Sequence, residues 1–309
     1  TIFVKLTIFV KLTIFVKLIM KNIIIYLIKL YFKSFEKILL IHYLVLRFYQ
    51  SKFINFININ LITSFSNDFK KEITHTTGNK KIKLSFFTPN NNCMLRANTF
   101  STKEPETLLW IEEFGKKGGI MFDIGANIGL YSIFHSLLNK SKSYAFEPSF
   151  FNLRQLIRNI NLNKCENLII TVVNPLTSCN KIEKFNYSSI EEGGALSAFG
   201  VDYGQDGEEM ESVVSNNVIG FSLDYLIASG LIKDEPTMIK IDVDGIEHLI
   251  LEGAIDTISS IDCRSILVEV NSDFKEQERI VHEILQDCGF VLREKFMSDF
   301  IHKHHIGVP

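Results

Sequence analysis

The chain has 309 residues, 46% of them hydrophobic, which is enough for the packed core of one large α/β domain with a tail. Its five scattered cysteines include no C-x-x-C pair, which excludes a disulfide framework and a cysteine zinc site and indicates reduced thiols in a cytosolic protein. The whole chain has a net charge of −2, but residues 1–62 hold nine Lys or Arg and one acid. This basic, apolar segment favours an anionic membrane face over nucleic acid as a partner.

The chain opens with three identical hexapeptides, Thr-Ile-Phe-Val-Lys-Leu, over residues 1–18. A period of six residues does not match the 3.6-residue turn of a helix, and identical copies are typical of a translated tandem DNA repeat. Met20 looks like a more natural start of translation. We therefore expect residues 1–19 to be an artefact of the gene model and exclude them from the fold.

Residues 20–62 are an apolar, basic N-terminal extension, in which Lys29, Lys33 and Lys37 repeat at helical spacing. No uninterrupted run reaches the roughly 20 apolar residues that a membrane-spanning helix needs. Two interpretations stay open: an amphipathic helix lying on a membrane surface, or helices packed on the domain that follows. The polar residues 63–80 are expected to form a linker.

From residue 81 to residue 309, apolar strands alternate with helical patterns, which predicts a doubly wound, mostly parallel α/β sheet. Residues 175–220 break this alternation with several glycines and many acids, and we expect them to be an insertion near the carboxyl ends of the strands. The predicted strands are 81–86, 119–123, 142–146, 167–173, 237–241, 265–270 and a closing antiparallel pair at 290–292 and 300–302, and the main predicted helices are 126–138, 149–163, 246–257 and 274–288.

A tight turn follows the strand that ends in Asp123, and it contains Gly125, Asn127 and Gly129. Glycine lets a ligand lie against the backbone. The spacing G-x-x-x-G differs from the G-x-G-x-x-G of dinucleotide sites, and the Asp123 carboxylate repels phosphate but suits the ammonium and sulfonium of S-adenosylmethionine. Glu147 ends the next strand, where a carboxylate is placed to bind two ribose hydroxyls. These five residues are the predicted cofactor-binding set.

A second group of acids, Asp242, Asp244 and Glu247, follows the strand at 237–241 and is expected to face the same crevice. Methyl transfer to an alcohol needs an aligned hydroxyl and removal of its proton, and Asp242 is the predicted catalytic residue for both tasks. The three acids also suit a divalent cation that activates the hydroxyl, so metal dependence stays open. The alternative is that they are helix N-terminal acids stabilised by the helix dipole. Glu269 is a weaker candidate for the same wall.

An ordered series of short motifs runs from Lys81 to Leu292. Its pieces are Arg96, Thr99, 103–107, 110–111, 122–129, 146–148, 222–224, 239–247, 252–254 and 268–271. In this series the chain resembles the FkbM-type methyltransferase family. The resemblance implies an S-adenosylmethionine-dependent O-methyltransferase and a Rossmann-like class I sheet of seven strands with a reversed last strand. Asp244 stands where the family more often has Glu, and Asn174-Pro175-Leu176 replaces the usual Asn-x-Ala-Leu.

The leading hypothesis is therefore a methyltransferase that modifies a hydroxyl of a small-molecule, glycan, lipid or polyketide-type acceptor. An NAD-dependent oxidoreductase and a non-catalytic membrane-associated module are the alternatives, and the missing G-x-G-x-x-G motif opposes the first of these. We expect no nucleic-acid partner. The expected location is the cytoplasm, with peripheral contact of residues 20–62 with the inner face of the membrane.

Overall fold

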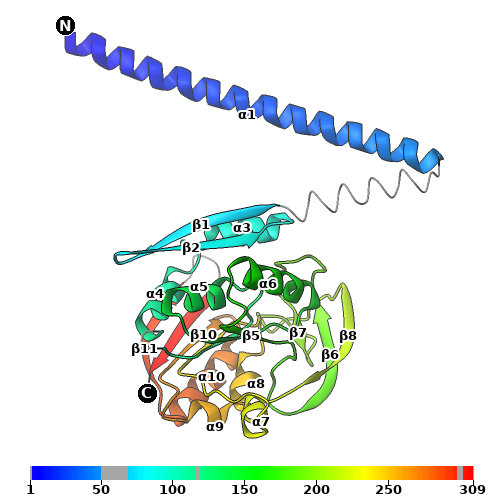
Figure 1. The fold of residues 1–309 in the computed structure, drawn as a ribbon, viewed down its shortest axis with the longest axis vertical. Helices are drawn as coiled ribbons and strands as arrows, with labels where there is room; N and C mark the ends of the chain where they lie inside the picture. The colour runs from blue at the N-terminus through cyan, green and yellow to red at the C-terminus, as the bar shows by residue number, and fades with distance from the viewer. Residues whose placement is uncertain (1, 50–68, 116–117, 298–301, 309) are drawn as a thin grey trace. The chain divides into compact units, whose positions relative to one another are not determined.

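The structure is a computed structural model that describes residues 2–49, 69–115, 118–297 and 302–308 (Figure 1). By its internal contacts the chain divides into two compact units, Thr1–Phe65 and Ser66–Pro309.

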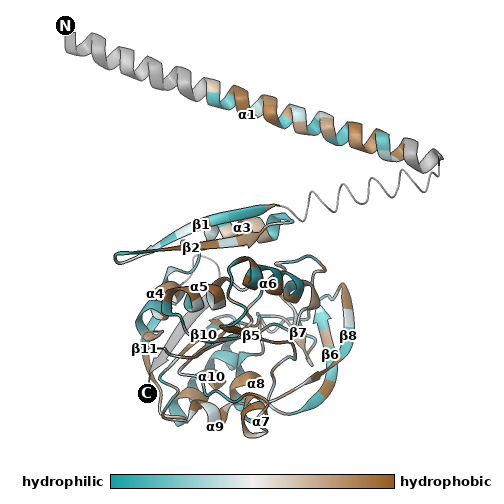
Figure 2. Cartoon of the chain, viewed as in Figure 1, coloured by the Kyte–Doolittle hydropathy of each residue, from teal (hydrophilic) through white to brown (hydrophobic). Residues whose placement is uncertain are grey.

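Helix α1, Ile2–Tyr49, makes up the described part of the first unit. The prediction that the six-residue period fits no helix is wrong, because helix formation depends on backbone propensity and this segment contains neither Gly nor Pro. Every residue from Met20 to Leu44 is exposed, and apolar positions alternate with polar ones along the helix (Figure 2). Within the described residues, none of the helices is long and apolar enough to cross a membrane. Residues 50–62 of the predicted extension lie outside the described residues.

The second unit begins with a β-hairpin formed by β1 (Lys70–Thr77) and β2 (Lys80–Phe87). The sequence assigned residues 63–80 to a linker, which is wrong for β1, while 63–68 lie outside the described residues. Gly78 has a φ of +52° and allows the tight turn between the strands. Leu84 and Phe86 of β2 are fully buried, so the hairpin belongs to the core of this unit.

A central sheet organises the second unit, in the order β11-β12-β10-β9-β3-β4-β5. The predicted parallel core is confirmed by the five strands from β10 to β5. β12 runs antiparallel to both β10 and β11, so the sheet has seven strands with β12 reversed. The strands are β3 (Met121–Ile124), β4 (Ser143–Phe146), β5 (Ile169–Val172), β9 (Met238–Ile241), β10 (Ser265–Asn271), β11 (Val291–Met297) and β12 (His302–Val308).

The helices of the second unit lie on both sides of this sheet (Figure 1). Because side chains alternate along a strand, Met121 and Phe122 of β3 enter two different buried clusters, one on each face. One face carries α3 (Asn91–Thr99), α4 (Pro105–Phe114), α5 (Leu130–Asn139) and α6 (Phe150–Leu162), and the other carries α7 (Leu223–Ala228), α8 (Glu247–Glu252), α9 (Ile255–Ile258) and α10 (Lys275–Asp287).

The register of the parallel strands sets the position of the site. Ile124 pairs with Phe146 of β4 on one side and with Ile241 of β9 on the other, so the three strands end at the same level. The residues that follow them therefore meet at one edge of the sheet. Residues 175–220 add a separate three-stranded antiparallel sheet beside this edge, with β6 (Lys181–Tyr187) between β7 (Ala198–Phe199) and β8 (Val214–Gly220).

Candidate active site

The turn after β3 brings the glycine motif against the ends of two neighbouring strands. Gly125 has a φ of +87°, and its N–H donates to the carbonyl of Phe146 at 3.0 Å. A Cβ atom on Gly125 would lie 1.8 Å from the backbone carbonyl oxygen of Asp242. Only glycine fits this position, because both the conformation and the close approach exclude a side chain.

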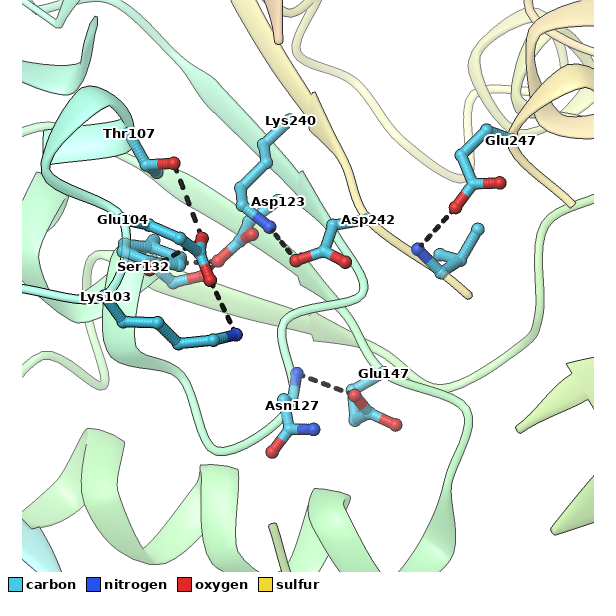
Figure 3. A network of polar contacts seen from close by, with 12 residues as sticks. Lys103, Glu104, Thr107, Asp123, Asn127, Ser132, Glu147, Lys240, Asp242 and Glu247 are labelled. Atoms are coloured by element: carbon cyan, nitrogen blue, oxygen red, sulfur yellow. Dashed lines mark hydrogen bonds and ion pairs between the residues drawn. The ribbon is translucent and has the colours of Figure 1, made fainter. Parts of the chain in front are cut away.

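Glu147 follows β4 and is buried, with 5% of its surface exposed. Its carboxylate accepts the backbone N–H of Asn127 at 2.7 Å (Figure 3). It also accepts the backbone N–H of Ser149 at 2.8 Å. Burial raises the pKa of Glu147 to about 7, while the two N–H groups act in the opposite direction. Glu147 therefore fixes the glycine turn as well as lining the adjacent cavity.

A pocket that is open to solvent lies over this edge. Gly125, Glu147 and Asp242 line it, so all three strand ends contribute. The Oδ1 atom of Asn127, another lining residue, is buried and has no hydrogen-bond partner among the described residues. A polar atom left in this state favours a ligand with a donor group. Apolar walls come from Phe146, Leu176, Phe185, Phe199 and Ile250.

The insertion forms one wall of the cavity through Gly194, Ala195 and Ser197. The Gly194 carbonyl accepts the side-chain amides of Asn127 at 2.7 Å and Asn152 at 3.1 Å. Next to it, the Leu196 N–H donates to the Asp244 carboxylate at 2.7 Å. The insertion is thus tied to the glycine turn and to the loop after β9.

Two residues of the predicted cofactor-binding set, Asp123 and Gly129, have structural contacts within the fold. Asp123 is fully buried, and its carboxylate accepts the backbone N–H and the hydroxyl of Ser132 at 3.0 and 2.5 Å. Gly129 has a φ of +88°, and a Cβ there would lie 2.5 Å from Leu156 of α6. Asp123 therefore anchors the first turn of α5, and Gly129 lets α6 approach. The direct ligand contacts predicted for both stay predictions.

Asp242 is paired with Lys240, two residues earlier (Figure 3). The Lys240 ammonium donates to the Asp242 carboxylate at 2.6 Å, and the two side chains are 2% and 27% exposed. Burial lowers the pKa of Lys240, but the charges of Asp242, Glu104 and Asp123 outweigh it and hold this pKa above its usual value. A charged, buried lysine therefore holds a carboxylate that stays accessible from the cavity.

Glu104 reaches the same place from just before α4. Its carboxylate accepts the Tyr131 hydroxyl at 2.8 Å and the Lys103 ammonium at 2.9 Å. Carboxylate oxygens of Glu104, Asp242 and Glu269 all lie within 4.8 Å of one another, so they are a candidate cation-binding group. The sequence grouped Asp242 with Asp244 and Glu247 for this purpose, and the structure groups it with Glu104 and Glu269.

Glu247 stabilises the loop that leads into α8. It accepts the N–H groups of Val243 and Gly245, both at 3.1 Å, and the side-chain amide of Gln277 at 2.6 Å. Burial raises the pKa of Glu247 to about 7 and that of Asp244 to about 6. The hydrogen bonds of Glu247 fit the helix N-terminal interpretation, and its part in a metal site stays a prediction.

A second cleft lies beside the glycine turn and contains basic groups that sequence reasoning did not assign. Arg96, Lys103 and Lys240 line it together with Gly125 and Asp242. The Nε of Arg96 also donates to the Gly193 carbonyl of the insertion at 2.7 Å. The only signal for Arg96 and Lys103 in the sequence was their place in the ordered motif series.

A family model described as the methyltransferase FkbM domain matches residues 123–292. Among curated proteins, hexuronic acid methyltransferase AglP of Haloferax volcanii is 22% identical over 180 residues, which cover 58% of this chain and 68% of that protein. Among solved structures, methyltransferase FkbM from Methylobacillus flagellatus is 17% identical, with a TM-score of 0.42 over 62% of this chain and 43% of that one. Precorrin-6y C5,15-methyltransferase from Geobacter metallireducens is 14% identical, with a TM-score of 0.41 over 67% and 89%.

Proposed function

The chain belongs to the FkbM methyltransferase family, whose model matches more than half of it, and we propose that it transfers a methyl group from S-adenosylmethionine to a hydroxyl of a sugar-type acceptor. The family match favours this over an NAD-dependent oxidoreductase and over a non-catalytic module. The observation that carries the proposal is the meeting of Gly125, Glu147 and Asp242 at one sheet edge, in the lining of one cavity.

The residues of this cavity suit an adenosine group. Glu147 would accept the ribose hydroxyls, since a carboxylate can take more hydrogen bonds than the two it now receives from the backbone. The unpartnered Asn127 Oδ1 offers a further acceptor. The apolar walls formed by Phe146, Phe185 and Phe199 would cover the adenine.

The second cleft suits the other end of the same molecule, which carries an amino acid group. Arg96 and Lys103 offer guanidinium and ammonium donors for its carboxylate. S-adenosylmethionine supplies an electrophilic methyl group when bound. The chain's own task is to hold the acceptor in line with that group and to receive the proton of the hydroxyl.

The acceptor side is polar. A third cleft adjoins Asp242 and is lined by carboxylates and amides, which together recognise hydroxyl groups as donors and acceptors. This lining suits a polyhydroxylated molecule better than an apolar one, and the name of the curated relative also points to a sugar. The lining residues are Gln205, Asp242, Asp244, Gly245, Glu247, Glu269, Asn271 and Gln277.

Cofactor binding tests the assignment of Glu147. Replacing Glu147 by alanine should weaken binding of S-adenosylhomocysteine by about 1.5–3 kcal/mol, as expected for hydrogen bonds to a charged group. Because burial raises the pKa of Glu147 to about 7, affinity of the wild type should also rise between pH 6 and pH 8 as the carboxylate ionises. Calorimetry at several pH values measures both effects.

The matched control for this titration is Glu147→Gln, which keeps the shape and cannot ionise. Its affinity should be low and independent of pH over the same range. Equal affinity of the wild type and Glu147→Ala at pH 8 would show that the ribose is bound elsewhere.

We further propose that α1 attaches the protein to an anionic membrane surface. Its described side chains are exposed, large apolar groups such as Phe32 and Leu40 among them, and Lys29, Lys33 and Lys37 lie on one stripe. Each surface lysine would contribute about 1 kcal/mol on an anionic leaflet. The full chain should therefore sediment with phosphatidylserine vesicles at low salt and be partly released by salt.

Phosphatidylcholine vesicles and a variant with Lys29, Lys33 and Lys37 all replaced by glutamate are the controls, and both should reduce sedimentation. A full-length protein that stays in the supernatant at low salt contradicts the membrane proposal. It would favour packing of the apolar side chains within the protein.

A further inference from the structure

Lys240 is a fully buried lysine whose charge the proposed chemistry does not yet use. It lies on β9 with 2% exposure, and its ammonium is 2.6 Å from the Asp242 carboxylate and 5.1 Å from the centre of the Tyr131 ring. Burying an ammonium is costly unless opposite charges and hydrogen bonds compensate for the lost water. The groups around Lys240 must therefore provide these charges and hydrogen bonds.

Those groups are carboxylates gathered from four separate segments of the chain. Oxygens of Glu104, Asp242 and Glu269 lie within 4.8 Å of one another, and Asp123 is fully buried nearby. Carboxylates this close cannot all stay ionised unless a cation or a proton is shared among them. In many proteins with such a group the cation is a metal ion held by several oxygens.

The Lys240 ammonium is placed to supply the positive charge that these carboxylates require. Lys240 and Asp242 are two residues apart, so their side chains leave the same side of the extended backbone. Among the described residues Lys103 also lies close to the group, but its side chain is 43% exposed and its ammonium donates to Glu104. Lys240 is therefore a buried cation in direct contact with Asp242.

We propose that the Lys240 ammonium is the built-in cation of this carboxylate group, where it positions Asp242 toward the acceptor hydroxyl in place of a divalent metal ion. The positioning part of this role rests on the proposed methyl transfer. Lys240 is a positioning residue, since it acts through the Asp242 carboxylate.

Metal binding tests the proposal without any measurement of activity. Calorimetry and thermal unfolding of the full chain with Mn²⁺ should show weak binding and no stabilisation for the wild type. Lys240→Ala removes the internal cation and should bind Mn²⁺ about tenfold or more tightly, with a raised Tm. The double variant Lys240→Ala/Asp242→Asn should lose that gain. Lys240→Met keeps the length of the side chain and gives a second measurement of Mn²⁺ affinity if the alanine variant folds poorly.

The matched control is Lys142→Ala, which breaks a lysine–aspartate pair of similar length, 2.7 Å to Asp234, outside the site. It should gain no Mn²⁺ affinity. Equal Mn²⁺ binding by the wild type and both Lys240 variants would overturn the proposal that Lys240 is the built-in cation.

Turnover separates this role from a purely structural one. Methyl transfer by the wild type should survive chelation, Lys240→Ala should lose about 10²-fold or more in kcat, and added ethylammonium or Mn²⁺ should restore part of it. Full activity of Lys240→Ala without additives would overturn the positioning role. If no methyl transfer is found for the wild type while the Mn²⁺ results hold, the proposed function fails and the built-in cation stands.

Discussion

Replacing Asp242 by asparagine is expected to lower the turnover of methyl transfer by about 10²–10⁴-fold while leaving cofactor affinity almost unchanged. The amide keeps the size of the side chain but can neither receive a proton nor form the ion pair with Lys240 at 2.6 Å. Kinetics with labelled S-adenosylmethionine and a panel of hexuronic acids and neutral hexoses measure turnover. Calorimetry with S-adenosylhomocysteine measures the affinity.

Asp234→Asn is the matched control, because Asp234 also pairs with a lysine, Lys142, but lies outside the lining of the three clefts. Turnover of this variant should stay close to that of the wild type. Full activity of Asp242→Asn would remove Asp242 from the chemistry, whether as a base or as a ligand of a metal ion.

Replacing Gly125 by alanine is expected to destabilise the fold by at least about 3 kcal/mol and to abolish cofactor binding. A Cβ would lie 1.8 Å from the Asp242 carbonyl, so either the turn or the end of β9 has to move. Both line the cavity, and a shift of either one separates Glu147 from Asp242. Chemical denaturation and titration with S-adenosylhomocysteine measure the two effects.

Gly289→Ala measures the backbone strain alone, and its difference from Gly125→Ala gives the steric part of the effect. Gly289 has nearly the same φ, +88° against +87°, but a Cβ there meets no atom within 4 Å. Its replacement should cost only the backbone strain, about 1–2 kcal/mol. If the two variants lose equal stability, the close approach of the strand ends is not what requires glycine at 125.

The sequence by itself determined the parallel core of the sheet and the edge at which the site lies. Alternating strands and helices predict such a sheet, and residues that follow its strands share one edge, so Gly125, Glu147 and Asp242 were found from their places after apolar runs. Gly78 indicated a tight turn, but the polar, charged sequence of β1 did not indicate a strand, so the hairpin was not predicted.

Only the tertiary structure decided which charged groups meet. Glu104 is far from Lys240 and Asp242 in the chain, and no periodicity indicates that it lies beside them. Asp123 shows the same limit, since no pattern in the sequence indicates that its carboxylate accepts two hydrogen bonds from Ser132 of α5. A pattern along the chain specifies which face of an element is buried. The partner across that face depends on how α4, α5 and β9 pack, because burial makes an unpaired charge costly and so selects the contacts.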